Sequence, residues 1–205
     1  MTFPSPCLIC GRRSESGLCA ECRANFERAK SVSDAPVLFS DGAYTLFDYS
    51  SPTVKRLIFS LKTRGLRGAA RVFSDAVFAS AKAIPREIVC VTFLPRRSLA
   101  RKRSGVDQAE LLARAIARKF GLPCLKLLRR RGVSRTQHGL SFEKRQENVR
   151  GKFAATKTVS GIRGAILLVD DIITTGASAT EACRTLREAG ARRIYVLAMA
   201  KGGSR

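Results

Sequence analysis

Apolar residues follow two kinds of pattern along the second half of the chain. Continuous apolar runs cover 88–94, 166–169 and 194–200, and each is too short for a helix. Such runs are typical of parallel strands that are buried on both faces. Between the runs, apolar residues recur at helical spacing over 107–120 and 179–189, each followed by a glycine. The pattern therefore predicts an α/β domain with a central parallel sheet flanked by helices.

The first half of the chain has a weaker version of this pattern. Tyr44–Phe47 predicts a strand, and Ser51-Pro52 predicts a helix with an N-cap serine and proline at the first helical position. A second helix is predicted over 66–82, with Phe73, Ala76 and Val77 facing inward. The polar, proline-containing residues 31–41 predict a linker, and 123–128 predicts one more strand.

The helix over 107–120 has its own start and stop signals. Asp107 can cap its N-terminus, and Glu110 stands three residues later, where it can reach back as in a capping box. Gly121 is placed to end the helix. We expect its inward face to consist of Ala109, Leu112, Ala113, Ile116 and Phe120.

The stretch that follows the 166–169 run combines acids with a small-residue loop. Asp170 and Asp171 come at the predicted strand end, and Thr174, Thr175, Gly176, Ala177 and Ser178 precede the next helix. Free N–H groups at a helix N-terminus, with the helix dipole, bind anions. A phosphate alone gains nothing from two neighbouring acids, whereas a sugar phosphate offers hydroxyls that acids can accept hydrogen bonds from. The alternative is an ordinary strand–helix turn with incidental acids.

Composition and charge narrow the function classes. The 205 residues suit one domain plus a small appendage, and 45% of them are apolar. The net charge of +22 predicts a polyanionic ligand or partner: pyrophosphate, nucleic acid or both. No apolar run approaches the roughly 18 residues of a membrane span, and no secretory signal is recognised. Neither a Walker lysine nor a G-x-G-x-x-G occurs, which argues against a P-loop or dinucleotide fold.

Four of the seven cysteines form two C-x-x-C pairs, Cys7/Cys10 and Cys19/Cys22. Four thiolates at this spacing predict a closed, structural zinc site in a module over 1–30, and zinc contributes about 10–16 kcal/mol in comparable peptides. A redox pair is the alternative. An odd cysteine count fits a reducing cytoplasm. The remaining cysteines lie in apolar contexts and are expected in the core: Cys90, Cys124 and Cys183.

Residues 129–150 form a long polar segment rich in arginine. A loop of this length inside a compact domain is usually functional or disordered. Leu140 and Phe142 give it apolar groups to pack, which favours a mobile active-site loop. His138 has no partner histidine, so it is a weak candidate for substrate contact and a weaker one for metal.

The acid-and-threonine stretch resembles the PRPP-binding motif of type I phosphoribosyltransferases, and nearly the whole chain resembles the ComF family within that superfamily. The matching residues are Pro95, Arg96, Arg97, Arg103, Gly105, Gln108 to Ala113, Arg135 to Gln137, Gly139, Leu140, Arg145, Asn148 and Asp170 to Ser178. Ser104 intrudes before Gly105, and Val106-Asp107 replaces the family's usual Phe-Asn. Thr174 stands where purine-salvage relatives carry a catalytic aspartate.

The resemblance implies that residues 31–205 form a type I phosphoribosyltransferase domain with a hood, and that its core covers 88–200. It also implies roles for individual residues. Asp170 and Asp171 would bind the ribose hydroxyls, with Arg96 and Arg97 on the pyrophosphate. Thr174–Ser178 would hold the 5-phosphate, and magnesium would arrive with PRPP. The pyrophosphate and loop residues would be Arg103, Arg135, Gln137, Arg145 and Asn148.

Three functions stay open at this point. The chain is a phosphoribosyl-transferring enzyme, a PRPP- or nucleotide-sensing module without catalysis, or a factor that handles single-stranded DNA. The ComF resemblance implies a role in DNA uptake during natural transformation, with a DNA-uptake helicase as a partner. The acceptor of the phosphoribosyl group and the oligomeric state do not follow from the sequence.

Overall fold

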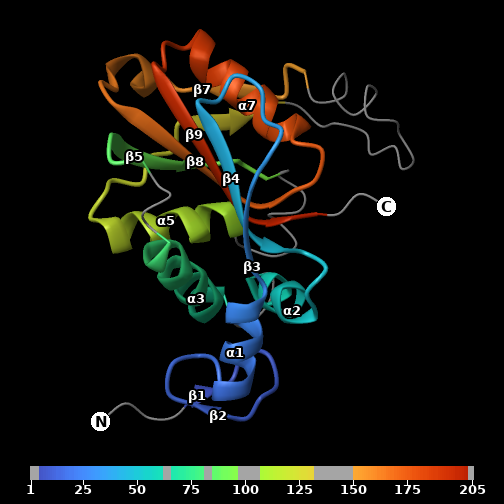
Figure 1. Ribbon diagram of the computed structural model, residues 1–205. Helices are drawn as coiled ribbons and strands as arrows, with labels where there is room; N and C mark the ends of the chain where they lie inside the picture. The colour runs from blue at the N-terminus through green and yellow to red at the C-terminus, as the bar shows by residue number, and fades with distance from the viewer. Residues whose placement is uncertain (1–4, 62–65, 81–84, 97–106, 132–149, 203–205) are drawn as a thin grey trace.

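The computed structural model describes residues 5–61, 66–80, 85–96, 107–131 and 150–202 (Figure 1). Its centre is a five-stranded sheet in the order β3-β4-β9-β8-β5. Neighbouring strands from β4 to β5 are parallel, whereas β3 pairs with β4 in the antiparallel direction. The strands are β3 Lys30–Asp34, β4 Gly42–Asp48, β5 Ile88–Phe93, β8 Ala165–Ile173 and β9 Arg193–Lys201. The predicted α/β fold with a mostly parallel central sheet is confirmed.

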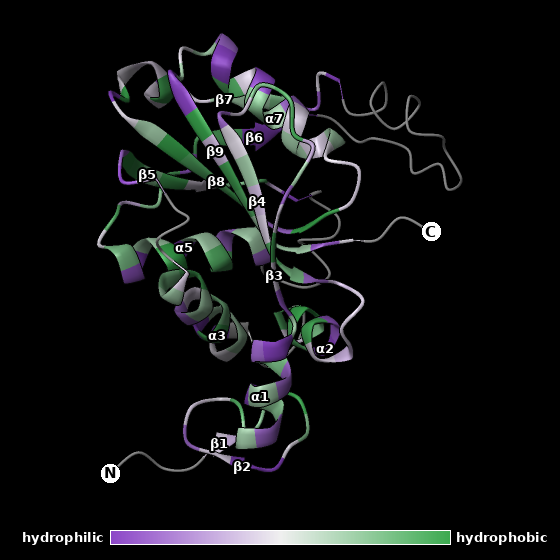
Figure 2. Cartoon of the chain, viewed as in Figure 1, coloured by the Kyte–Doolittle hydropathy of each residue, from purple (hydrophilic) through white to green (hydrophobic). Residues whose placement is uncertain are grey.

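Strand β8 is buried on both faces, as its unbroken apolar run predicts. Ala165, Leu167 and Val169 belong to the core on one face of the sheet. Ile166 and Leu168 belong to the core on the other. Figure 2 shows β8 in the hydrophobic colour along most of its length. Parallel strands with helices on both sides have no solvent-facing side, so no polar residue interrupts this part of the sequence.

The helices divide between the two faces. Helices α2 Pro52–Leu61, α3 Leu66–Ala79 and α5 Gln108–Phe120 share the core of one face, and α7 Ala177–Glu188 covers the other (Figure 1). The two-stranded hairpin of β6 Leu128–Arg130 and β7 Phe153–Ala155 lies on the α7 side, followed by the 3₁₀ turn Lys157–Gly161. Among the described residues, no helix is both long and apolar enough to cross a membrane.

The N-terminal residues form a small module whose core is continuous with that of the sheet. The module contains β1 Ser5–Pro6, β2 Arg13–Ser14 and α1 Ala20–Arg28. Phe26 on α1 stacks on Phe47 of β4 with ring centroids 4.4 Å apart, and Phe73 of α3 meets both rings edge-on. The module is therefore packed onto the α/β domain through an aromatic cluster of three rings. The division of the chain at residue 30 stays a prediction.

Most predicted helix signals are confirmed, including the stop at Gly121, which has a left-handed φ of 67°. Phe73, Ala76 and Val77 are buried, as expected. The capping box is only half right. Asp107 caps α5, but the Glu110 carboxylate accepts two hydrogen bonds from Arg114 instead of reaching back.

Two segments differ from their predictions. Residues 31–41 contain most of β3, because Ser33 and Asp34 pair with Thr45 and Tyr44 of β4, so the linker prediction is wrong there. Residues 123–128 make a single bridge to β5, between Cys124 and Val91, and regular pairing begins only at Leu128. The Leu127 N–H donates to the Thr92 hydroxyl and not to a strand backbone. Burial along the sheet edge, rather than strand pairing, explains this apolar pattern.

Candidate functional site

The acid pair lies where β8 extends beyond its neighbour β5. The pairing of β5 with β8 ends at Phe93 and Val169. On its other side, β8 continues along β9 through Asp170 to Ile173, which pairs with Lys201. The acids thus lie near the end of the strand, as the sequence predicts, although the strand continues to Ile173. No described strand lies opposite them on the β5 side, so they are on the carboxyl edge of the parallel sheet, where ligands bind in α/β folds.

Arg96 meets this acid pair from the end of β5. The Leu94 N–H donates to the Val169 carbonyl over 3.0 Å, which holds the chain beside β8 just beyond the strand. Two residues later, the Arg96 guanidinium is 3.8 Å from Asp171 Oδ2. Both side chains are largely shielded, with 29% of Arg96 and 14% of Asp171 exposed. Arg96 therefore joins the predicted site, as the sequence indicates.

Asp107 fixes the backbone around Arg96. Its Oδ2 accepts the Arg96 N–H over 2.8 Å, and its Oδ1 accepts the N–H groups of Ala109 and Glu110. One buried carboxylate thus caps helix α5 and ties the helix to the end of β5. The Asp that replaces the family's usual Asn at this position therefore positions the backbone, and its charge also acts on Asp170.

The electrostatics of the two acids differ. Burial raises the pKa of Asp170 well above its ordinary range, and the adjacent Asp171 carboxylate and the more distant Asp107 add to the shift. Asp170 Oδ1 accepts the Asp171 N–H over 2.8 Å, and Asp171 Oδ1 accepts the Ile172 N–H over 3.0 Å. These two backbone bonds hold the carboxyl groups in fixed positions. A cation or hydroxyl ligand would relieve the repulsion between them.

The loop after β8 leaves N–H groups of helix α7 open for an anion. Gly176 is the N-cap residue, and it has no side chain to cap the helix. Among the described residues, no acceptor is recorded for the Ser178 or Ala179 N–H. The first turn of α7 carries no acid, and the only local capping contact is a weak one of 3.4 Å from the Ala177 N–H to Thr175 Oγ1. The arrangement fits a phosphate at this helix terminus.

Gly176 cannot be replaced without strain. Its φ is +74°, in the left-handed region that side chains rarely adopt. A Cβ at this position would lie 2.3 Å from the Pro36 carbonyl oxygen. Nearby, the Leu38 N–H donates to Thr180 Oγ1 over 3.1 Å. The segment between β3 and β4 is therefore packed against the start of α7, and it supports the loop from outside.

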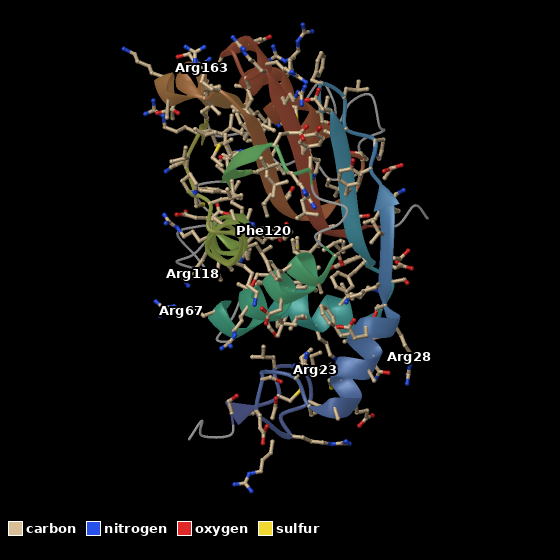
Figure 3. The ribbon with its side chains drawn as sticks, turned by 60° about the vertical axis from the view of Figure 1, so that its left-hand side comes forward. Arg23, Arg28, Arg67, Arg118, Phe120 and Arg163 are labelled. Carbon is tan, nitrogen blue, oxygen red and sulfur yellow. The ribbon has the colours of Figure 1, made fainter. Side chains whose placement is uncertain are left out.

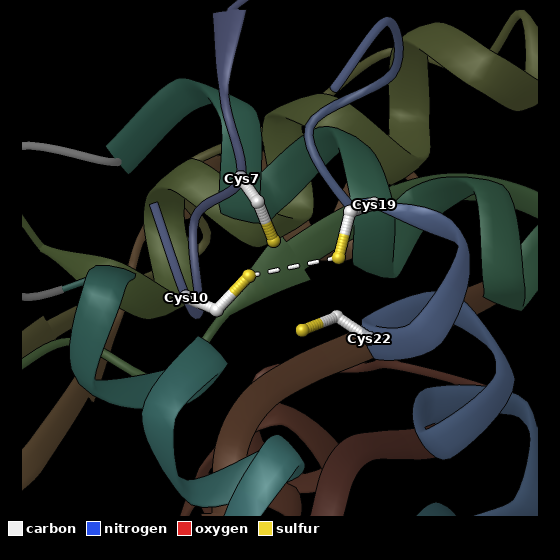
Figure 4. Close-up of side chains that lie close together, drawn as sticks. All are labelled: Cys7, Cys10, Cys19 and Cys22. Carbon is white, nitrogen blue, oxygen red and sulfur yellow. Dashed lines mark hydrogen bonds between the residues drawn. The ribbon is translucent and has the colours of Figure 1, made fainter. Parts of the chain in front are cut away.

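The four N-terminal cysteines form one cluster. The Sγ atoms of Cys7, Cys10, Cys19 and Cys22 all lie within 4.8 Å of one another (Figure 4). Burial acts to raise the pKa of Cys7, but N–H donors from Cys10, Cys19 and Ile9 outweigh it and lower the pKa to about 6. A thiolate there suits a metal ligand. Four converging sulfur atoms with no other donor fit tetrahedral zinc in a closed, structural site.

The other three cysteines behave as core residues. Burial raises the pKa of Cys90 to about 11 and that of Cys183 to about 12, and it also raises the pKa of Cys124. Thiols in this state are poor nucleophiles and poor metal ligands. The expectation that they are inert agrees with their environment.

Several predicted site residues lie outside the described residues: Arg97, Arg103, Arg135, Gln137, His138, Arg145 and Asn148. Both ends of the 129–150 segment are described, however. The Arg131 N–H donates to the Lys152 carbonyl over 2.7 Å, next to the β6–β7 hairpin. The Gly151 N–H donates to Glu181 on α7 over 2.6 Å. The same helix that begins at the candidate phosphate loop thus also anchors the segment's C-terminal end.

Sequence reasoning gave no role to Glu181 or Gln108. The Glu181 side chain is only 8% exposed and forms an ion pair with Arg184. Gln108 is buried, and neither polar atom of its amide has a hydrogen-bond partner in the described structure. Two signals single out Gln108: it belongs to the segment that matches the ComF pattern, and it precedes Leu112 by one turn on the inward face of α5.

Comparison with known proteins identifies relatives that cover most of the chain. This chain is 35% identical to Competence protein F of Haemophilus influenzae over 102 residues, which are 48% of this chain and 44% of that protein. It is 27% identical to DNA utilization protein YhgH of Salmonella typhi over 199 residues, 93% of this chain and 77% of that protein. The match thus spans less than half the length of the first relative. The predicted resemblance to the ComF family is confirmed by these relatives.

Solved structures add a weaker similarity. The glutamine PRPP amidotransferase from B. subtilis, complexed with ADP and GMP, is 26% identical, with a TM-score of 0.43 over 63% of this chain and 26% of that chain. The α/β assignment rests on the strand order and register of this chain and not on that similarity. No protein-family model matches the chain.

Proposed function

We propose that the chain binds PRPP, or a related ribose phosphate, at the carboxyl edge of its sheet. The observation that supports this most is that two acids at the end of β8 are followed by an N-terminus of α7 whose N-cap residue, Gly176, has no side chain. The open N–H groups fit the 5-phosphate, and the acids fit the ribose hydroxyls. A phosphate alone would not need the two acids, and a polyol alone would not need the open N–H groups. A ligand that is both a phosphate and a polyol uses both.

In this proposal the residues divide the ligand between them. Thr174–Ser178 hold the 5-phosphate, and Asp170 and Asp171 accept hydrogen bonds from the hydroxyls. Arg96, 3.8 Å from Asp171, lies toward the leaving pyrophosphate. Magnesium bound with PRPP would neutralise part of the charge on the pyrophosphate and on the acids. Catalysis then follows from stabilising the charge on the leaving group and from orienting the nucleophile.

The roles of the residues outside the described structure are part of the same proposal. Arg97 and Arg103 would extend the contact with pyrophosphate begun by Arg96. The arginine-rich 129–150 segment would exclude water during the reaction through Arg135, Gln137, Arg145 and Asn148. Thr174, at the position of the catalytic aspartate of purine-salvage relatives, cannot shuttle a proton as a carboxylate does. A hypoxanthine- or guanine-type proton shuttle from this position is therefore not available.

Calorimetry with PRPP and Mg²⁺ tests the binding proposal. The double substitution Asp170→Asn and Asp171→Asn should abolish the binding heat while the zinc content stays unchanged. Asp75→Asn is a matched control, because Asp75 pairs with Lys119 on the exposed side of α3 and α5. Unchanged affinity in the double variant would remove the site. Pyrophosphate release across a panel of bases then separates an enzyme from a sensor that binds PRPP without turnover.

A role in DNA uptake is a second part of the proposal, favoured by the names of the relatives and by the charge of +22. Figure 3 shows labelled arginines on the outside of α1, α3 and α5 and beside the sheet: Arg23, Arg28, Arg67, Arg118 and Arg163. All are exposed. Their spread over several elements suits a polyanion better than one small phosphate.

Salt dependence tests this second part. If the basic surface binds single-stranded DNA, affinity should fall steeply and linearly on a logarithmic salt scale. Few aromatic side chains accompany the arginines, so base stacking should contribute little, and binding should tolerate changes of sequence. Affinity that is insensitive to salt would contradict a charge-driven contact. The helicase and other uptake partners, and a cytoplasmic location, belong to the same proposal.

A further inference from the structure

Gln108 is a buried amide without a hydrogen bond. It is the first residue of helix α5, and only 1% of its surface is exposed. Neither Oε1 nor Nε2 has a partner in the part of the chain that the structure describes. More than nine in ten buried polar groups in proteins are paired, and an unpaired one lowers stability. An unpaired amide therefore calls for a ligand or another functional explanation.

The position of Gln108 next to the candidate site is fixed by its neighbour. Asp107 is bonded to the backbone of Arg96 on one side and to the first turn of α5 on the other. Arg96 in turn faces Asp171. Gln108 is thus one residue from the carboxylate that joins α5 to the site. Its backbone cannot move away without breaking the cap.

The side chain is on the inward face of the helix. Leu112 and Ile116 follow Gln108 at intervals of four residues, and both are fully buried. This face of α5 belongs to the same core as Leu167 and Val169 of β8, the residues that lead to the acid pair. A glutamine at the end of an apolar stripe, beside the carboxyl edge of the sheet, is poorly explained by packing alone.

The chemistry of the amide limits what can satisfy it. Nε2 donates and Oε1 accepts, so the complementary group must do both. Phosphate oxygens only accept, and they would leave Oε1 unpaired. Two vicinal ribose hydroxyls satisfy both atoms, because one can donate to Oε1 while the other accepts from Nε2. Ionised carboxylates such as Asp171 only accept, so the acids alone leave the lone pairs of those hydroxyls without a protein donor.

We propose that Gln108 binds the two vicinal ribose hydroxyls of the phosphoribosyl ligand: one hydroxyl donates to Oε1, and the other accepts from Nε2 and donates to Asp171. This inference rests on the proposed function, since it assumes a sugar phosphate at that site. Both amide atoms are shielded from bulk solvent in the ligand-free chain, so a hydrogen bond to the ligand does not require further burial of Gln108. A ligand without these hydroxyls would leave the amide without them as partners.

The substitution Gln108→Met tests the proposal, because methionine has a similar length and no polar group. In the ligand-free chain, Tm should stay the same or rise, since two unpaired buried atoms are removed. The Kd for PRPP with Mg²⁺, measured by calorimetry, should rise about tenfold or more, since the hydrogen bonds from Oε1 and Nε2 to the ligand hydroxyls are lost. Leu112→Met is the matched control one turn along the same face, and it should leave the Kd unchanged.

The outcomes are separable. An unchanged Kd in Gln108→Met, with PRPP bound by the wild-type chain, overturns this inference and leaves the proposed function intact. A wild-type chain that does not bind PRPP overturns both. If Gln108→Met folds poorly, the side-chain NH₂ resonances of Gln108 in the wild-type chain decide the matter. They should shift and exchange more slowly with PRPP, and resonances that do not respond contradict the proposal.

Discussion

At the scale of single residues, the two adjacent carboxylates have unequal surroundings. Asp171 faces the Arg96 guanidinium, whereas burial and the neighbouring carboxylate raise the pKa of Asp170. An acid whose pKa is raised on folding destabilises the native state as it ionises. Below its ordinary pKa both states are protonated and the penalty is absent. It develops as the pH rises above that value, where the unfolded chain ionises and the native Asp170 resists.

Asp170→Asn should therefore stabilise the ligand-free chain at neutral pH. We expect a gain of about 0.5–2 kcal/mol at pH 7, the range of single stabilising substitutions. The gain should vanish as the pH falls toward 4, because the wild-type acid is then protonated in both states. Urea unfolding at several pH values measures it. A variant less stable than wild type at pH 7 would contradict the raised pKa, and Asp75→Asn serves as the exposed control.

Gly176→Ala should damage the loop at the start of α7. The left-handed φ costs an alanine about 1 kcal/mol, and the clash with the Pro36 carbonyl adds to it because backbone cannot easily move aside. We expect a loss of about 2 kcal/mol or more in thermal unfolding, and weaker PRPP binding. Gly161→Ala is a suitable control, since no atom lies within 4 Å of a Cβ there and its φ is not left-handed. Equal Tm values for both variants would contradict the strained geometry.

At the scale of elements, the sequence predicts best where one physical cause dominates. The run ending at Val169 is apolar because β8 is buried on both faces. A half-exposed strand would alternate apolar and polar residues, and an amphipathic helix would space them by three or four, so neither alternative fits this run. Helix α5 has a cap residue, an apolar stripe and a terminal glycine that agree with one another. Such agreement between independent local signals is what makes an element predictable.

The elements that were missed depend on contacts far away in the sequence. Strand β3 is short, polar and exposed for most of its length, and it is a strand only because β4 pairs with it. The apolar residues of 123–128 are buried by the sheet edge without forming a ladder. The sequence predicts the acid pair. It does not predict that β9 continues alongside the pair and keeps it within a strand, because that depends on the register between β8 and β9. No local pattern encodes these features.

The start of α5 gives an element-scale prediction. Asp107→Ala removes the cap and the acceptor of the Arg96 N–H, and should cost about 2 kcal/mol in unfolding free energy. Asp107→Asn keeps one acceptor oxygen. It also removes a carboxylate whose pKa is raised by burial, so the unfolding free energy of this variant should stay within about 1 kcal/mol of wild type. Chemical denaturation distinguishes the two. An asparagine variant as unstable as the alanine one would show that both oxygens are essential.

At the scale of the whole molecule, the cysteine module and the α/β domain share one hydrophobic core. Cys7 and Cys22 belong to the same buried cluster as Leu57 and Phe73. The sequence predicts a module whose folding depends on a metal. It does not reveal that the Phe26 side chain of this module stacks on Phe47 of the α/β domain. A metal held by these cysteines would therefore stabilise α2 and α3 as well as the module.

Zinc removal should consequently be felt beyond the first 30 residues. Without metal the four sulfur atoms lose their common ligand, α1 loses its anchor, and Phe47 and Phe73 lose the ring of Phe26. We expect chelation, or Cys10→Ser at the exposed ligand, to lower the free energy of unfolding by at least about 2 kcal/mol, which is about 4–8 °C in Tm for a chain of this size. Cys183→Ala, on the buried face of α7, should lower Tm without changing the zinc content. If the chelated chain kept the Tm of the zinc-loaded one, the shared core would have to be stable without the module, and the linkage argued from Phe26 would be wrong.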